Sequence, residues 1–172
     1  MHPVDVLTYG QGTVLRTVEG LPAADWDTTG VCGWWSVRQI VAHLASFEHI
    51  LIEALAIAGD TRDDYGPTLK AWFRNGQVFN DEQVTNRAAL SPEATLADFA
   101  AAHAQTIALA AALPAGAWQR TGFLRAYGAE YDPEDFITYA FYGHKREHAA
   151  QIAVFRDAIP PYNKRKGGLP TA

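Results

Sequence analysis

The sequence has little cysteine, little positive charge and no long apolar run, and each shortage excludes a class of protein. Its only cysteine, Cys32, rules out an internal disulfide, which fits a reducing cytosol. The 14 Lys and Arg residues are outnumbered by 19 Asp and Glu, whereas a nucleic-acid-binding domain usually has a basic face. No stretch is long and apolar enough to predict a membrane span, and no secretory signal pattern opens the chain. We therefore expect a cytoplasmic protein that binds neither nucleic acid nor a membrane.

The remaining composition is that of an ordinary globular domain. Hydrophobic residues make up 48% and charged residues 19% of the 172 residues, enough to bury one core. No internal repeat and no linker divides the chain. The end of the chain is rich in proline, glycine and basic residues, which is typical of a solvated tail. We predict a single domain over residues 1–159 and a flexible C-terminal tail over 160–172.

Helix-start signals recur along the chain, and alternation with period two is scarce. Ser36 and Gln39 have the spacing of a capping box. Two later sites combine a capping side chain, a proline at the first helical position and an acid, which are Ser91-Pro92-Glu93 and Asp132-Pro133-Glu134. Together with apolar spacing near the start, these signals predict long helices over about 4–18, 36–58, 91–113 and 132–158, and a short one from 80–82 to 89. The fold class is then all-α, a four-helix bundle with short connecting helices.

The last predicted helix carries two histidines where a core stripe would normally carry leucine or isoleucine. His144 and His148 are one turn apart, so both rings can reach one ion, and Gln151 follows on the same face. Arg146, Ala149 and Asp157 are expected to point away or sideways. Two neighbouring buried imidazoles need polar partners. A shared metal ion would provide them, and so would hydroxyl or carbonyl groups around two ordinary core histidines.

The second predicted helix places one more histidine toward the interior. Its first apolar stripe comprises Val37, Val41, Leu44, Leu51 and Leu55, and an adjacent one comprises Ile40, His43, Phe47, Ile50 and Ala54. His43 is therefore predicted to lie inside, whereas His49 shares the polar side. On the helix over 91–113, His103 also faces inward. Three roles are open to it, in this order: a core histidine, a residue that bonds a ligand or substrate, or a fourth ligand.

Two segments together resemble a known group of proteins, the DinB/YfiT-like superfamily. The first has the pattern W-S-x-x-x-I-x-x-H-L and runs from Trp35 to Leu44; the second has the pattern H-x-x-x-H-x-x-Q-I and runs from His144 to Ile152. The resemblance extends from about Val4 to Ile159. It implies a four-helix bundle with a three-histidine metal site at His43, His144 and His148.

The resemblance also implies a range of chemistry. Members include transferases and isomerases that use mycothiol, bacillithiol or glutathione, proteins that act on reactive small molecules, and frequent homodimers. Neutral imidazoles bind zinc, nickel or iron, so the ligand set does not select the metal. Three protein ligands leave a position open for substrate or water, as in catalytic sites. We predict a metal-dependent enzyme acting on a small molecule, a thiol-dependent transferase or isomerase or else a hydrolase.

Other functions remain open at this point. Glu147, next to the two histidines, is a candidate general base or orienting partner, although a surface carboxylate paired with Lys145, Arg146 or an adjacent helix is slightly favoured. The run from His144 to His148 also fits H-x-x-E-H, a metallopeptidase pattern. A downstream acidic residue completes the site in such enzymes, and Asp157 is the only acidic residue after His148 in this sequence. A bundle that binds a metal or ligand without turnover is the main alternative to an enzyme.

Overall fold

The computed structural model describes residues 1–159, so the predicted tail over 160–172 lies outside the described residues. The helices are α1 (Pro3–Val18), α2 (Val37–Ala58), α3 (Pro67–Arg74), α4 (Gly76–Asn86), α5 (Pro92–Ala112), α6 (Pro133–Ile137) and α7 (Gly143–Ala158). Within residues 1–159 there is no strand, and an isolated bridge joins Cys32 to Trp35. The predicted all-α class is confirmed.

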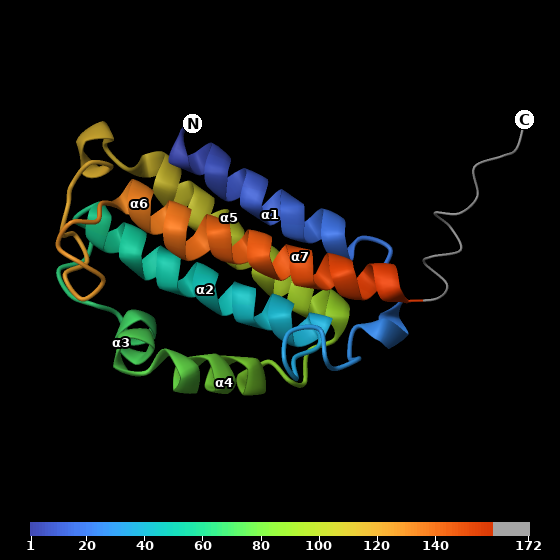
Figure 1. Cartoon of the computed structure of the whole chain (residues 1–172). Helices are drawn as coiled ribbons and strands as arrows, with labels where there is room; N and C mark the ends of the chain where they lie inside the picture. Colours follow the sequence, from blue (N-terminus) through green and yellow to red (C-terminus); the bar gives the residue numbers. More distant parts are fainter. Residues whose placement is uncertain (160–172) are drawn as a thin grey trace, which may run out of the picture.

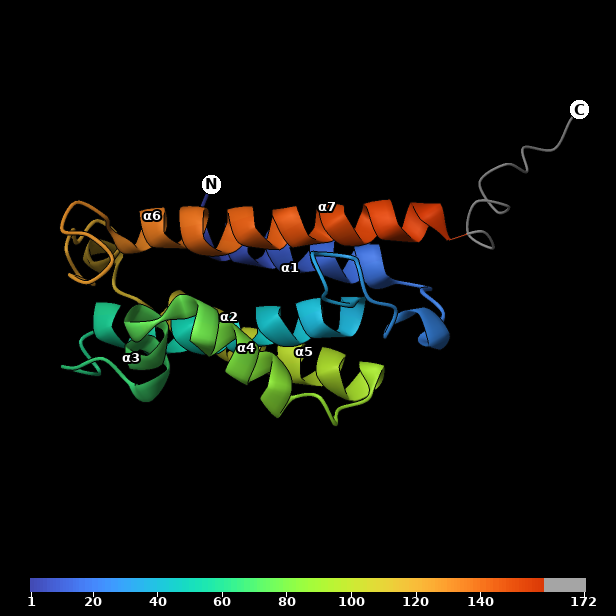
Figure 2. The same cartoon turned by 60° about the horizontal axis from the view of Figure 1, so that its bottom comes forward.

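The four long helices form a bundle of two layers. Figure 1 shows them side by side, and Figure 2 shows α1 with α7 in one layer and α2 with α5 in the other. The two short helices α3 and α4 cover the outer side of α2. The helix α2 is therefore enclosed by α5, α3 and α4, with α7 above it. This enclosure makes α2 the central element of the fold.

Most predicted helix starts are confirmed by their side-chain caps. Ser36 accepts a hydrogen bond from Gln39 N and completes the capping box, and Ser91 and Asp132 cap α5 and α6. The connecting region differs from the prediction. The short helix α4 begins after Asn75, whose side chain accepts from Val78 N, and ends at Asn86 rather than at residue 89. The additional helix α3 lies between residues 58 and 80, where no helix was predicted.

The prediction that no stretch is long and apolar enough to cross a membrane is wrong for α2. By length and composition, α2 is long and apolar enough to cross a membrane, although no stretch was expected to be. Most of the apolar segment is buried inside the bundle, and the core helix of a soluble protein passes the same test. The apolar character of α2 is accounted for by its central place.

The last helix is continuous but contains one wide turn. A π-helical segment over Thr138–Tyr142 joins α6 to α7. Phe136 and Phe141, five residues apart, are both fully buried, which is the spacing that a π turn allows. After this turn the buried stripe continues through Lys145, His148 and Ile152.

The wide turn changes which residues of α7 face the core. Ala149, expected to point away or sideways, is buried, and Lys145 lies deeper than His144. His144 is only partly buried and lies at the edge of the stripe. The buried face of α7 is therefore rotated about the helix axis relative to the face predicted for a regular helix.

The hydrophobic core consists of two clusters, one toward each end of the bundle. One contains Phe47 and Leu51 of α2, and the other contains Ile40 and Leu44 of the same helix. His43 lies close to where the two meet. The polar groups described below are thus held between two apolar blocks.

Candidate metal centre

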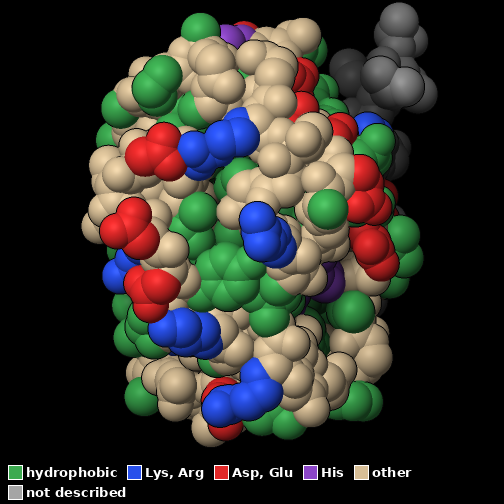
Figure 3. Space-filling view, turned by 90° about the vertical axis from the view of Figure 1, so that its left-hand side faces the viewer, with side chains coloured by type: hydrophobic (Ala, Val, Ile, Leu, Met, Phe, Trp, Pro, Cys, Tyr) green, Lys and Arg blue, Asp and Glu red, His purple; other side chains and the backbone are tan. Residues whose placement is uncertain are grey.

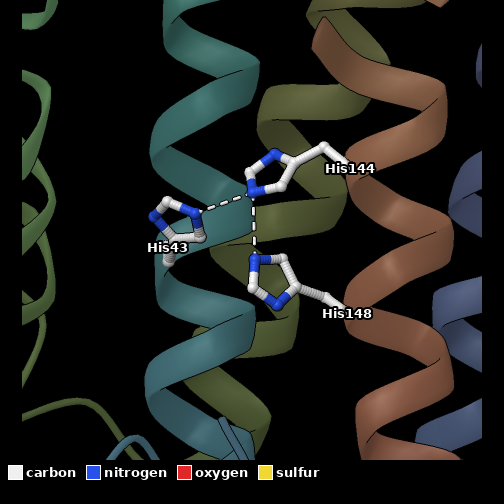
Figure 4. A group of neighbouring side chains, drawn as sticks. All are labelled: His43, His144 and His148. Carbon is white, nitrogen blue, oxygen red and sulfur yellow. Dashed lines mark hydrogen bonds between the residues drawn. The ribbon is translucent and has the colours of Figure 1, made fainter. Parts of the chain in front are cut away.

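Three histidine side chains converge between α2 and α7. The Nε2 atoms of His43 and His144 lie 2.9 Å apart, and those of His144 and His148 also lie 2.9 Å apart. Figure 4 shows the three rings pointing toward one another, with His144 in the middle. The three ligand atoms all lie within 4.8 Å of one another. The structure therefore brings together the three residues predicted as ligands.

Each ring is held by its neighbours. The His43 ring packs against Trp35 and Phe47, with ring centroids 4.8 and 4.7 Å away. Phe47 also contacts the His144 ring, at 4.4 Å. His144 and His148 follow the π turn and lie one helical turn apart on α7. Aromatic rings thus enclose one side of the cluster, and His144 is the least buried of the three histidines.

Burial keeps the three rings uncharged at neutral pH. Loss of water, and then the nearby histidines, lower the pKa of His43 from 6.5 to about 2. The same loss of water, followed by His148 and Lys145, lowers the pKa of His144 to about 3. The pKa of His148 is also lowered, mainly by burial. A neutral imidazole has one nitrogen lone pair free for a metal ion.

Gln151 determines which nitrogen of His148 carries the lone pair. Its Oε1 lies 2.8 Å from His148 Nδ1, and a carbonyl oxygen can only accept a hydrogen bond. The proton of a neutral His148 is then on Nδ1, which leaves Nε2 as the acceptor facing His144. This is the arrangement that orients an imidazole toward a metal.

The donor set fits a divalent ion. Neutral imidazole nitrogens are ligands of zinc, nickel and iron, and nitrogens bound to zinc lie about 2 Å from it, which places them roughly 3.3 Å apart in a tetrahedron. The observed separations bracket that value. Three converging nitrogens also have more lone pairs than protons to share, because His148 already uses its proton on Gln151. A cation would satisfy all three.

Substitution of Gln151 by leucine should weaken metal binding without unfolding the protein. The leucine cannot accept the Nδ1 proton of His148, so the ring loses its fixed tautomer and orientation. We expect a 10- to 100-fold loss of zinc affinity, measured by competition with a chelator. Gln151→Glu, which keeps an acceptor oxygen, is the matched control and should retain the affinity. Equal affinities for the leucine variant and the unmodified protein would contradict this role.

The lowered histidine pKa values also predict acid sensitivity of the metal-free protein. Below pH 6.5 the unfolded chain takes up protons on His43 and His144, whereas the folded chain does not until the pH nears 2 to 3. The free energy of unfolding should therefore fall as the pH drops from 6.5, by up to about 1.4 kcal/mol per pH unit for each ring. Urea unfolding in EDTA at pH 7.5, 6.5 and 5.5 measures this slope. It should become shallower in His43→Phe, and an unchanged slope there would refute the assignment.

The other predicted site residues lie outside the cluster. Glu147 is exposed on α7. Its charge acts on His148, whose pKa it raises slightly against the larger effect of burial. Within residues 1–159, none of the hydrogen bonds or ion pairs found joins the Glu147 carboxylate to a histidine ring. A role for Glu147 as a base remains a prediction.

His103 is buried but belongs to a different group. Its Nδ1 lies 3.3 Å from Glu48 Oε1, and Lys145 Nζ forms an ion pair with the same carboxylate. The Glu48 side chain is fully buried and Lys145 is 2% exposed. His103 is therefore a core histidine with a polar partner, the first of its three predicted roles.

Sequence reasoning missed Glu48 and Lys145, although a signal for Glu48 was present. The apolar stripe through Leu44 and Leu51 of α2 skips one helical position, which is residue 48. A carboxylate at that position must face the core. Lys145 gave no such signal, because the π turn before it changes the face of α7 to which it belongs.

A cavity lies beside the histidine cluster. It has a volume of about 210 Å³ and is lined by Cys32, Gly33, Trp34, Trp35 and Gln77. Trp35 forms part of its wall and also packs on His43. Trp34 is 71% exposed, so it extends into solvent at this cavity. The Trp35 ring is therefore the contact between this cavity and the histidine cluster.

Aromatic side chains also extend from the site to one end of the bundle. Trp72 of α3 contacts Phe47 at 5.9 Å and stacks on Tyr127 at 6.5 Å. Figure 3 looks onto this end and shows hydrophobic side chains gathered at its centre, with both basic and acidic side chains around them. Trp72, at this end of the bundle, is thus connected to the His144 ring through Phe47 alone.

These features define a class of protein and then a family. A four-helix bundle with three histidines converging from its second and last long helices is a DinB/YfiT-like domain. The sequence model of the family described as "Mycothiol maleylpyruvate isomerase N-terminal domain" matches residues 10–137, and the chain belongs to that family. No match was found among curated proteins or among solved structures. The matched span ends before His144 and His148, so the placement of these two residues beside His43 rests on the geometry alone.

Proposed function

We propose that this protein is a divalent-metal-dependent enzyme that acts on a small molecule, with a low-molecular-weight thiol as co-substrate. The observation that carries the proposal is the convergence of three neutral imidazole nitrogens, one of them on the partly exposed His144. A closed structural site would have a fourth protein ligand. In residues 1–159 the ligand group has three members, which leaves room for substrate.

Each residue has a role in this proposal. His43, His144 and His148 hold the ion, and Gln151 keeps the His148 lone pair on Nε2. Trp35 and Phe47 exclude water from one side of the cluster. When bound, a zinc, nickel or iron ion would act as a Lewis acid and lower the pKa of a bound thiol or water. The deprotonated nucleophile would then be present at neutral pH. The cavity at Trp35 and the aromatic surface at Trp72 are the surfaces available to an organic substrate.

The family supports a thiol as the nucleophile. Its description names mycothiol and an isomerase, so thiol-dependent transfer or isomerisation with mycothiol is our first proposal for this chain. Bacillithiol and glutathione are the alternatives. Attack by water, as in a hydrolase, requires the same three ligands, and we rank it below attack by a thiol. We further propose a cytoplasmic homodimer that binds neither nucleic acid nor a membrane.

Calorimetric titration tests the proposal directly. The protein loaded with zinc, nickel or iron is titrated with mycothiol, bacillithiol and glutathione in turn, and the metal-free protein is the control. We expect one thiol to bind the loaded protein and not the metal-free form. An added electrophile should then be converted, with the thiol consumed in a transfer or regenerated in an isomerisation. Binding of metal without any thiol would favour a hydrolase, and binding of thiol without turnover would favour a non-catalytic binding bundle.

A further inference from the structure

The bundle contains a buried ion pair that the metal site does not use directly. Lys145 of α7 and Glu48 of α2 are paired in the core, with 2% and 0% of their side chains exposed. His103 of α5 contacts the same carboxylate oxygen. Burial by itself would raise the pKa of Glu48, but the Lys145 charge and the contacts with His103 together outweigh it and hold that pKa well below its usual range. Glu48 is thus ionised beside a cation in the interior.

Lys145 contacts all the other long helices. Its stem passes α1 at Gly10, where a Cβ atom would lie 3.4 Å from Lys145 Cδ and 3.3 Å from Tyr142 Cδ2. Its ammonium group lies 5.7 Å from the centre of the Phe99 ring on α5 and pairs with Glu48 on α2. One side chain therefore links α7 to each of the three other helices of the bundle.

A pair of this kind is not explained by stability. Removing two charges from water is costly, and well-packed apolar residues of similar volume are often as stabilising or more so. An ion pair does, however, specify one arrangement, because the two charges must meet at a fixed place, whereas apolar side chains tolerate small rotations and shifts. Its presence points to a requirement for orientation.

The orientation it determines is that of the metal-ligand helix. Lys145 directly follows His144, and successive helical residues are separated by about 100°. A rotation of α7 that moved Lys145 away from Glu48 would move His144 and His148 away from His43 as well. On the other side, Glu48 lies on α2 little more than one turn from His43. The ion pair and the histidine cluster thus join the same two helices at the same level.

We propose that Glu48 and Lys145 are positioning residues that hold α7 in the rotation at which His144 and His148 meet His43. His103 supports the pair by contacting the Glu48 carboxylate from α5. The inference rests on the proposed metal function for its metal readout, whereas the positions of the three rings can be measured without metal.

The test removes both charges together. In the double variant Glu48→Leu/Lys145→Met both charges of the pair are removed and His103 loses its contact with Glu48, so the protein should still fold, with a melting temperature close to that of the unmodified chain. Zinc affinity, from chelator competition, should nevertheless fall at least tenfold. The visible absorption spectrum of the cobalt-loaded protein should change, and the metal-free protein should lose nuclear Overhauser contacts between the rings of His43 and His144.

Two further variants make the outcome decisive. Ile152→Val, a core change on α7 away from the pair, should lower stability and leave zinc affinity unchanged. Glu48→Asp keeps the charge but shortens the side chain, so it should also weaken zinc binding, and it decides the question if the double variant does not fold. Wild-type zinc affinity and ring contacts in the double variant, or wild-type zinc affinity in Glu48→Asp, would overturn the inference. If the unmodified protein binds no metal, the proposed function fails, and loss of the ring contacts in the double variant would still support positioning.

Discussion

Replacement of His148 by alanine is expected to abolish metal binding. The variant leaves two imidazoles, and it removes both the ring that His144 faces at 2.9 Å and the partner of Gln151. Loss of an outer partner of a ligand already costs 10- to 100-fold in affinity, so loss of the ligand itself should exceed about 100-fold. Metal quantification on protein purified without chelator should fall from near one ion per chain to almost none.

The matched control is another histidine of the same bundle. His49 lies on α2 but outside the cluster, so His49→Ala should retain the metal content of the unmodified protein. The circular dichroism of both variants should remain helical, because His148 is replaced by a good helix former. Retention of metal by His148→Ala, or an equal loss in His49→Ala, would refute the ligand assignment. Absence of metal and of stabilisation by zinc, nickel or iron in the unmodified protein would favour three plain core histidines.

The parts of this fold that follow local rules could be predicted from the sequence. The cap at Ser36 sets the start of α2, and counting along the helix from there places His43 on the inner face. The same logic placed His144 and His148 one turn apart. These inferences depend only on helical periodicity and on side chains that bond backbone groups of the same helix, which are interactions between near neighbours.

The parts that depend on contacts between distant segments could not be predicted in the same way. None of the local sequence signals used for the prediction indicates the π turn at Thr138–Tyr142. This turn rotates α7 enough to bury Lys145 and Ala149. No place in the core was assigned to Lys145 from the sequence, and lysine is usually exposed to solvent. Only the position of Glu48 within an apolar stripe indicated that a charge lies inside. Its partner on another helix becomes evident only in three dimensions.

Removal of the Lys145 charge alone should strongly destabilise the protein. In Lys145→Met the Glu48 carboxylate stays fully buried without its cation, and breaking a buried pair in this way typically costs about 3–5 kcal/mol. Urea unfolding at pH 7 of the metal-free protein measures the difference. Arg146→Met, an exposed neighbour on the same helix, should change stability by no more than roughly 0.5 kcal/mol.

The pH dependence of that loss distinguishes an unpaired charge from poor packing. In the unmodified protein Lys145 keeps the pKa of Glu48 low, so the contribution of the pair is present above pH 4.5 and is lost as the pH falls through the lowered value. In Lys145→Met the effect of burial, which raises the Glu48 pKa, is no longer opposed by that cation. The carboxyl group then takes up a proton on modest acidification, and the stability difference between the variant and the unmodified protein should shrink between pH 7 and pH 5. A difference that stays constant over this range would mean that methionine packs badly, and the charge of Glu48 would not be its cause.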